Sequence, residues 1–524
     1  MITPNSKIIL LKSPLELDNN NQITFSNANA QYTYFYSLPK KELENATFQR
    51  KDNILRFETN ETDFTFDDVL LYNYCMYQNT SYGNKWFYGF IKNCTYLNNG
   101  VVAIELKTDV FQTWQFDITW KQSFVEREHI AKSADVAGAN TIPENLETGE
   151  YIYTSATHSN FGGSHVVMGA TINITNGDAS GGTIINGLYS GVNYYAFKTI
   201  GDLGQCIKQI DEWGKSSAII SLFYTLDKIS DYNNLSWSTG GNTFTYQYSA
   251  LNNQNVSAVE IAQTDIDKPT SLGSYTPVNK KLLTFPYCYL HLTNNVGNNA
   301  IYHYEDFDTS LTNGYIRFIT YGALCPSNSI ITYPLNSKEG SVECGIMYAK
   351  LPICSWTNDI YTNWLTQNSV NIGVNIGIGT LSTVIGFATE NAVGVAGGIG
   401  AIAQSIGSIY EHSLIPPQAN GNSNAGDVLF SSLDLEFKWC KKHIKEEYAR
   451  IIDNYFTMYG YATKLLKLPN LNNRSNWNYV KTINANIEGA IPQNDIEEIK
   501  EIFNKGITLW HTTTHFLDYS QSNN

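Results

Sequence analysis

The residue patterns that usually support catalysis are incomplete in this chain of 524 residues. The run WGKSS at 213–217 has the Gly-Lys-Ser ending of a phosphate-binding loop, but Gln209 stands where that loop needs its first glycine. His511 and His515 have the spacing of a zinc-protease pair, yet Thr512 replaces the glutamate that would act as general base. Two hydrogen-bonded surface histidines are the better interpretation of that pair. We predict no catalytic residues, no metal site and no cofactor.

The cysteines and the net charge exclude further classes of protein. The cysteines are scattered without the two-residue spacing of tetrahedral zinc sites: Cys75, Cys94, Cys206, Cys288, Cys325, Cys344, Cys354 and Cys440. This pattern favours folding in a reducing cytosol, and the four-residue apolar run near the N-terminus is too short for a secretory signal. The net charge of −14 lacks the basic footprint that grips nucleic-acid phosphate.

The composition predicts a mainly β protein with some α-helix. Hydrophobic residues make up 42% and charged residues only 16%, so the chain should fold rather than stay disordered. Its 35 tyrosines exceed its 34 lysines and arginines, and aromatic residues suit pleated sheets better than helices. We expect strands at 31–37, 86–91 and 101–106, and again within 282–355. A short helix at 108–117, capped by Thr108, and another near 207–213 are expected between them.

Two amphipathic helices are predicted near the C-terminus. The first lies in 444–460, is stopped by Gly460, and carries on one face Ile444, Tyr448, Ile451, Ile452, Tyr455, Phe456 and Tyr459. The second lies in 494–506, with Asn494 and Glu497 at the spacing of a capping box and Gly506 as its end. Its stripe consists of Ile496, Ile499 and Phe503. Both stripes are interpreted as core contacts.

The segment 370–410 is almost free of charge, with Glu390 as its only charged residue. Glu390 divides it into two uncharged arms of about 20 residues, and a helix of that length spans the hydrocarbon core of a bilayer. We predict a membrane-active loop whose apolar residues are Val370, Ile372, Val374, Ile376, Ile378, Leu381, Val384, Ile385, Phe387, Val393, Val395, Ile399, Ile402, Ile406 and Ile409.

The glycines of this segment leave a second interpretation open. Many glycines, together with Asn371 and Asn375, make it pliable, as in a fusion peptide that is held by protein and inserted on demand. The alternative is a Gly-rich hairpin buried in the folded protein. The uncharged linker at 416–426 favours a segment that moves, since a buried hairpin needs no tether.

Several rare runs then carry a resemblance to a known family. They are NTSYGNKWFYGFI at 79–91, the stretch 106–130 that contains TDVFQTWQFDITW, LTFPYCYLHL at 283–292, the stretch 441–482, and IFNKGITLWHT at 502–512. In this order they resemble the tail-knob, or distal tail tube, protein of small short-tailed phages of the picovirus type. The region from about 135 to 280 carries no matching run.

The resemblance implies an organisation in five parts. The N-terminal part of a tube domain would cover 1–134, and an inserted knob domain 135–281. The tube domain would resume at 282–368, followed by the hydrophobic loop and its tether at 369–427. Its last part, with the two helices, would be 428–524. The family further implies a ring of six copies that contacts other tail proteins.

The resemblance also implies a function, which has two rivals. Hydrophobic loops would plug the tube, then enter the lipid of the host cytoplasmic membrane and form a pore for genome ejection, while double-stranded DNA passes through the lumen without specific binding. The protein would assemble in the host cytoplasm and lie at the distal end of the tail in the virion. One rival is an enzyme that cleaves cell-wall glycan, with Trp213, Tyr194 and Tyr195 stacking on sugars. The other is a receptor-binding adhesin in which the Gly-rich hairpin stays buried.

Overall fold

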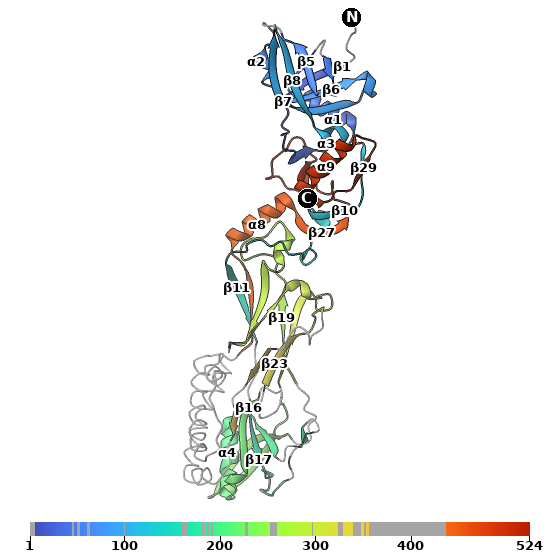
Figure 1. Cartoon of the computed structure of the whole chain (residues 1–524). Helices are drawn as coiled ribbons and strands as arrows, with labels where there is room; N and C mark the ends of the chain where they lie inside the picture. Colours follow the sequence, from blue (N-terminus) through green and yellow to red (C-terminus); the bar gives the residue numbers. More distant parts are fainter. Residues whose placement is uncertain are drawn as a thin grey trace, which may run out of the picture. The chain divides into compact units, whose positions relative to one another are not determined.

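A computed structural model of the chain describes most of its residues outside the region 356–435 (Figure 1). The described residues are 6–43, 47–49, 53–59, 63–98, 100–159, 165–180, 182, 184–185, 188–189, 192–225, 229–251, 259–295, 297–322, 329–338, 347–350, 353–355 and 436–524. The chain divides into two compact units. Unit 1 comprises Met1–Gly149, Ser274–Thr284 and Lys445–Asn524, and unit 2 comprises Glu150–Gly273 and Phe285–Ile444.

The first sheet of unit 1 has seven antiparallel strands in the order β3-β1-β6-β7-β8-β5-β4. Their bounds are β1 (Ser6–Leu11), β3 (Lys40–Leu43), β4 (Thr47–Gln49), β5 (Ile54–Glu58), β6 (Tyr74–Asn79), β7 (Trp86–Asn98) and β8 (Val101–Thr108). In β8 the alternate residues Val102, Ile104 and Leu106 are buried, as their period of two predicts. The predicted strands at 86–91 and 101–106 are thus confirmed.

The second sheet of unit 1 brings both ends of the chain together. Its order is β2-β30-β28-β10-β27, with β2 parallel to β30 and the other neighbours antiparallel. These strands and the small pair β9·β29 are β2 (Asn21–Ile23), β9 (Ile118–Trp120), β10 (Ser123–Glu128), β27 (Tyr461–Lys467), β28 (Trp477–Ile483), β29 (Ile487–Gly489) and β30 (Ile507–Trp510). The helices of unit 1 are α1 (Ala28–Ser37), α2 (Phe66–Val69), α3 (Val110–Trp114), α8 (Glu446–Tyr459) and α9 (Gln493–Lys505). The short 3-10 helices are η1 (Thr80–Tyr82), η2 (Lys132–Ala134) and η4 (Lys280–Leu283).

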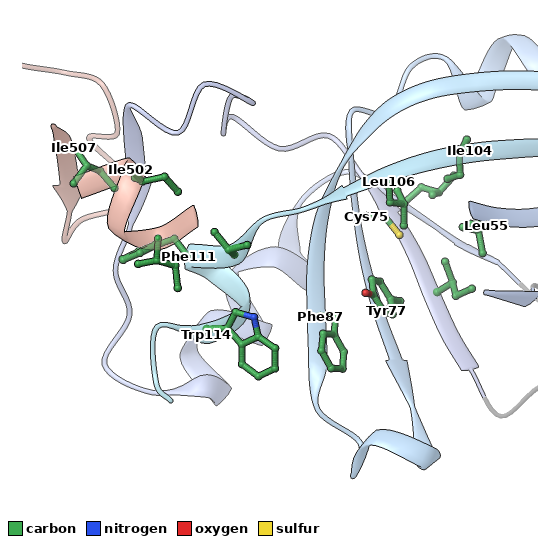
Figure 2. Packing of buried hydrophobic residues seen from close by; sticks show 14 of the residues in the cluster. Leu55, Cys75, Tyr77, Phe87, Ile104, Leu106, Phe111, Trp114, Ile502 and Ile507 are labelled. Carbon is green, nitrogen blue, oxygen red and sulfur yellow. The ribbon is translucent and has the colours of Figure 1, made fainter. Parts of the chain in front are cut away.

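One hydrophobic core joins the seven-stranded sheet to the C-terminal elements (Figure 2). Figure 2 shows Phe111 of α3 beside Ile502 of α9, while Leu106 and Leu55 lie on the strands of the sheet. The Nε1 atom of Trp114 also donates to Asp495 of α9 at 2.7 Å. Since burial of each large apolar side chain stabilises by about 1.5–3 kcal/mol, this cluster ties the first and last parts of the chain into one unit.

The described residues of unit 2 form three larger sheets and one small strand pair. The four-stranded sheet β11-β26-β20-β21 contains β11 (Tyr151–His158), β20 (Cys288–Thr293), β21 (Asn299–Tyr302) and β26 (Lys438–Ile444). The six-stranded sheet β17-β18-β15-β12-β16-β25 contains β12 (His165–Ala170), β15 (Asn193–Phe197), β16 (Ile219–Thr225), β17 (Asn233–Thr239), β18 (Asn242–Ala250) and β25 (Ile353–Ser355). The third sheet contains β19 (Val259–Asp267), β22 (Tyr315–Gly322), β23 (Ser329–Pro334) and β24 (Met347–Lys350), and the small pair is β13 (Ile184–Ile185) with β14 (Leu188–Tyr189).

A single α-helix is described in unit 2, namely α4 (Ile200–Glu212), which covers part of the six-stranded sheet. It includes most of the helix expected near 207–213 but begins earlier, where Thr199 and Asp202 form a capping box. The short 3-10 helices η3 (Ser216–Ala218) and η5 (Tyr304–Asp306) complete the unit. Strands predominate over helices in the described chain, so the prediction of a mainly β protein is confirmed.

The prediction of a strand at 31–37 is wrong, because these residues form most of α1. Asn27 caps this helix by accepting a hydrogen bond from the amide of Ala30. The two buried residues of the helix, Gln31 and Phe35, are four positions apart, and Phe35 lies against Tyr74 with ring centroids 5.4 Å apart. A local cap and a helical contact period thus override the strand propensity of the aromatic residues.

Three further details of the predicted helices differ from the structure. Asp109, rather than Thr108, caps α3 by accepting from the amide of Gln112. Asn494 lies inside α9, which begins after Pro492. Ile451 is 66% exposed because it lies beside, and not on, the buried stripe of α8, and Ile444 belongs to β26. The predicted ends at Gly460 and Gly506 are confirmed, as is the buried stripe of α9.

Candidate functional site

The chain crosses between the two units after Gly149, Gly273, Thr284 and Ile444. A mechanical force that is transmitted between the units along the covalent chain therefore enters unit 1 near these residues. Within unit 1, the segments next to the crossings are held by three buried carboxylates, those of Asp135, Glu144 and Asp453. We call these carboxylates and their partners the polar anchor.

Asp453 fastens the segment 274–284 to α8. The buried face of this helix consists of Ala449, Ile452 and Phe456 besides Asp453 itself, so the carboxylate points into the protein. It accepts hydrogen bonds from the Tyr275 hydroxyl at 2.6 Å and from the amide of Val278 at 2.8 Å. Asn279 donates to the same carboxylate twice, from its backbone amide at 3.0 Å and from its side-chain Nδ2 at 2.7 Å. A carboxylate with four donors is satisfied without solvent.

Glu144 forms the ionic part of the polar anchor. Its side chain has no exposed surface and pairs with both Arg127 and Lys281. The amide of Ala462, on β27, donates to it at 2.9 Å. Burial lowers the pKa of Lys281 while the neighbouring Glu144 opposes that shift. The extended chain around 144 is thus tied to β10, to 274–284 and to β27 at one point.

The segment 135–149 is fixed at its first residue by hydrogen bonds of Asp135 and at its last by close packing of Gly149. Asp135 accepts from the Tyr461 hydroxyl at 2.7 Å and from the amide of Lys280 at 3.2 Å. Gly149 has a φ of +66°, and a Cβ there would lie 2.6 Å from the ring of Tyr448. Buried carboxylates that accept from fixed donors, as Glu144 and Asp453 do, are suited to holding chain segments in place.

Sequence reasoning missed the polar anchor. Its partners are far apart in the chain, since Asp135 and Tyr461 are separated by 326 residues. The usable signal was Asp453, a charged residue between Ile452 and Phe456 on a helical face that is otherwise apolar. A carboxylate at such a position requires buried partners.

The sequence motifs that suggested chemistry are occupied by structural contacts. In WGKSS, Lys215 donates to the carbonyl of Gly177, and the run follows the C-terminal end of α4 instead of opening a helix. His511 contacts the Thr24 hydroxyl through Nδ1 at 2.7 Å and Asn478 through Nε2 at 3.0 Å. Burial lowers its pKa to about 4. Both ring nitrogens are thus engaged, and the described residues contain no group that could hold a metal ion.

The two tyrosines considered for sugar stacking belong to the interior of unit 2, since Tyr194 and Tyr195 are 6% and 2% exposed. Their rings are therefore not displayed on a surface where a glycan could stack on them. Trp213 is partly buried and packs against the core that contains Tyr195.

The predicted membrane-active residues, from Val370 to Ile409, lie outside the described residues, as do Glu390 and the tether 416–426. Their role in a membrane stays a prediction from the sequence. In the part of the chain that is described, no helix has the length and apolar character needed to cross a bilayer.

Unit 1 carries an exposed apolar patch at the edge of its five-stranded sheet. Phe124 of β10 is directly opposite Leu466 of β27 on one side and Ile483 of β28 on the other. These three side chains, which we call the apolar patch, are 39%, 66% and 47% exposed. They border a shallow surface depression of about 650 Å³, and β27 is the outer strand of the sheet. Exposed apolar clusters on an edge strand are typical of protein contact surfaces.

Comparisons with known proteins agree along the whole chain. A family model described as Bacillus phage phi29, tail knob protein gp9, C-terminal domain, matches residues 242–524, and one described as Caudoviral major tail protein N-terminus matches residues 4–121. Tail knob protein gp9 of Bacillus phage B103 is 27% identical over 93% of each chain, and that of Bacillus phage phi29 is 26% identical over 96% of each chain.

A solved structure extends the agreement to the fold. The bacteriophage C1 tail knob protein, gp12, aligns over 98% of both chains with a TM-score of 0.67 at 16% sequence identity, which shows a shared fold. The resemblance inferred from the quoted runs is thereby confirmed. Because the gp9 model matches more than half of the sequence, the chain belongs to the phi29 gp9 family of tail knob proteins.

Proposed function

We propose that this chain is a structural, non-enzymatic subunit of a tail knob, six copies of which close into a tube that conducts DNA. We further propose that the segment 370–410 plugs this tube and then enters the host cytoplasmic membrane to form a pore. The observation that carries the proposal is the match to tail knob proteins over nearly the full length of both sequences. The net charge of −14 is compatible with DNA that passes without binding.

The apolar patch supports assembly into a closed ring. Phe124, Leu466 and Ile483 leave apolar area in water at the edge of a sheet, and burial of such area against a neighbouring subunit is favourable. A ring gives every subunit the same neighbour and leaves no free edge. The polar anchor would then fix the chain crossings of each subunit while the tube is under load.

The ring is tested by electron microscopy and light scattering of the purified full-length chain. We expect hollow particles of uniform subunit number for the natural sequence. Leu466→Asp places a charge within the apolar patch, at its most exposed residue, and should convert the rings to monomers at micromolar concentration. Leu17→Asp changes a leucine of 45% exposure outside the patch and should leave the rings intact. Rings that persist in Leu466→Asp would remove the patch from the proposed interface.

The membrane role rests on the uncharged length of 370–410, which has two arms long enough to span a bilayer. A variant that lacks these residues should still form particles but should no longer release dye from liposomes. Replacement of the tether 416–426 by a Gly-Ser sequence of equal length is the matched control and should preserve release. Unchanged leakage with the deletion variant would refute the membrane role, while the ring experiment would still stand.

A further inference from the structure

Unit 2 contains a cavity of about 430 Å³ beside the sheet β11-β26-β20-β21. It is lined by the end of β19, by the loop 268–273 that follows this strand, and by residues of β20, β26 and η5. Both β11, of the same sheet, and β19 are labelled in Figure 1. A volume of this size is typical of sites for small molecules.

Two of the residues that line the cavity each carry a buried polar atom without a hydrogen-bond partner among the described residues. These atoms are Nε2 of His443 and the hydroxyl of Tyr304, and these residues are only 4% and 3% exposed. The Nδ1 atom of His443 lies 2.7 Å from the carbonyl oxygen of Ile444, which can only accept. Nδ1 therefore carries the proton, and Nε2 keeps a lone pair that has no partner among the described residues. Burial of an unpaired polar atom is costly, so such atoms indicate a partner that enters the site.

The backbone around His443 holds its ring in place. His443 on β26 is directly opposite Cys288 on β20, so both side chains lie on the same face of the sheet. Gly273 passes close above the ring with a φ of +61°, and a Cβ at this position would lie 3.3 Å from Cε1 of the imidazole. The lone pair of Nε2 is thus held at a fixed position.

Two lysines supply positive charge beside the cavity, Lys268 and Lys441, and Asp267 is the only carboxylate among the lining residues. Lys442 also borders it through its backbone position but faces the other side of β26. Glu305 and Asp308 lie near Lys268. Lys441 shares its face of β26 with His443, since alternate residues of a strand point to the same side. Neither Lys441 nor Lys442 forms an ion pair with any residue that the structure describes. Lys268 donates to the carbonyl of Phe307 at 2.9 Å, which leaves donors of the ammonium group for another acceptor.

We propose that this cavity is a binding site for a phosphorylated sugar or polyol. The phosphate, with a charge between about −1.5 and −2 near neutral pH, matches the excess of lysines. A hydroxyl of the sugar or polyol donates to Nε2 of His443 while its phosphate meets the lysines, and the Tyr304 hydroxyl bonds to a second ligand oxygen. This site is independent of ring formation and of the segment 370–410.

The proposal is tested by titration calorimetry on the full-length protein with three probes. Glucose 6-phosphate carries both recognition elements, inorganic phosphate lacks the sugar hydroxyls, and glucose lacks the phosphate. We expect glucose 6-phosphate to bind at least tenfold more tightly than either of the others. Equal binding of inorganic phosphate, or absence of binding by glucose 6-phosphate at millimolar concentration, would overturn the proposal.

Two variants connect the binding to the cavity. Tyr304→Phe removes one hydroxyl and should weaken binding of glucose 6-phosphate by about tenfold, the size of one hydrogen bond, while the melting temperature stays equal or rises. Lys441→Gln removes one charge and should weaken it by tenfold or more. Lys438→Gln, on the same strand but outside the cavity, is the control and should bind as the natural chain does. Affinity that is indifferent to both Tyr304→Phe and Lys441→Gln would overturn the proposal.

The same measurement distinguishes two sources of the ligand. A free sugar phosphate is a monoester, whereas a sugar phosphate within a polymer is a diester with a lower charge. Tighter binding of glucose 6-phosphate than of its methyl phosphodiester supports the site with a free sugar phosphate as its ligand. Binding of the diester that is equal or tighter supports it with a polymer as the source.

Discussion

Unit 1 and unit 2 differ in how many of their buried polar side-chain atoms lack a hydrogen-bond partner. In the described part of unit 1, the only buried side-chain polar atom without a hydrogen bond is Oδ2 of Asp135, which still lies 3.6 Å from the ammonium nitrogen of Lys132. The corresponding atoms of unit 2 are Asn193 Nδ2, Gln205 Oε1, Trp237 Nε1, Tyr304 Oη, Trp439 Nε1 and His443 Nε2. In the described residues, unit 1 has thus used its buried polar groups to fix its own chain, whereas unit 2 keeps several of them unpaired.

The strongest way to break unit 1 is to remove the carboxylate of Glu144. Glu144→Gln leaves the ammonium group of Lys281 and the guanidinium group of Arg127 without a buried counter-charge. The free energy of unfolding should fall by about 3–5 kcal/mol, as when one partner of a buried ion pair is lost. Guanidinium chloride unfolding at neutral pH measures this change. Glu105→Gln breaks an exposed pair with Lys92 and should leave the midpoint unchanged. Equal effects of the two substitutions would mean that the polar anchor does not stabilise unit 1.

Acid should weaken unit 1 through His129. This buried imidazole accepts from the amide of Tyr479 at Nδ1 and lies 3.1 Å from the carbonyl of Thr457 at Nε2, so it is neutral. Burial, together with the nearby Arg474, lowers its pKa to about 3. Below pH 6.5 the unfolded state therefore binds more protons than the folded state, and stability falls as the pH falls towards 3. Between pH 6.5 and 4.5 the loss is about 2 kcal/mol.

The measurement compares the natural chain with His129→Gln over this pH range. Asp109 acts in the opposite direction, because burial raises its pKa to about 6 and its contribution to stability is lost as the pH rises through 6. Only the difference between the two proteins isolates His129. The unfolding free energy of His129→Gln should change less with pH, whereas His515→Gln, at an exposed residue, should follow the natural chain. Parallel curves for all three proteins would contradict the prediction.

Two identical substitutions sharpen the contrast between the units. Tyr461→Phe in unit 1 removes the hydroxyl that donates to Asp135 at 2.7 Å and should cost about 2 kcal/mol of unfolding free energy. Tyr304→Phe in unit 2 removes a hydroxyl that has no described partner, so the cost should be close to zero. Thermal unfolding of both variants without ligand measures the difference. If Tyr304→Phe lowers the unfolding free energy as much as Tyr461→Phe does, the Tyr304 hydroxyl already has a hydrogen-bond partner inside unit 2.

The sequence was informative where a pattern is local and failed where partners are distant. The alternation of β8 and the stripe of α9 were predictable because burial of one face imposes a period along the chain. The polar anchor was not predictable, since Glu144 meets Lys281 and Ala462 only through the tertiary fold. The cavity around His443 was missed for the same reason. The sequence runs that resemble tail knob proteins, taken in their order along the chain, indicated the family more strongly than any single residue did.

In helix α1 the Asn27 cap outweighs the strand propensity of the aromatic residues. Removal of this cap gives the smallest of the expected changes in stability. Asn27→Ala removes the side chain that accepts from the amide of Ala30 and should destabilise unit 1 by about 1 kcal/mol. Asn29→Ala, within the same helix, replaces an exposed residue that makes no capping contact and should be neutral or slightly stabilising. Both values come from denaturant unfolding. If the two substitutions have equal effects, the cap does not explain why an aromatic run with strand propensity folds as a helix, and the contact between Phe35 and Tyr74 must suffice.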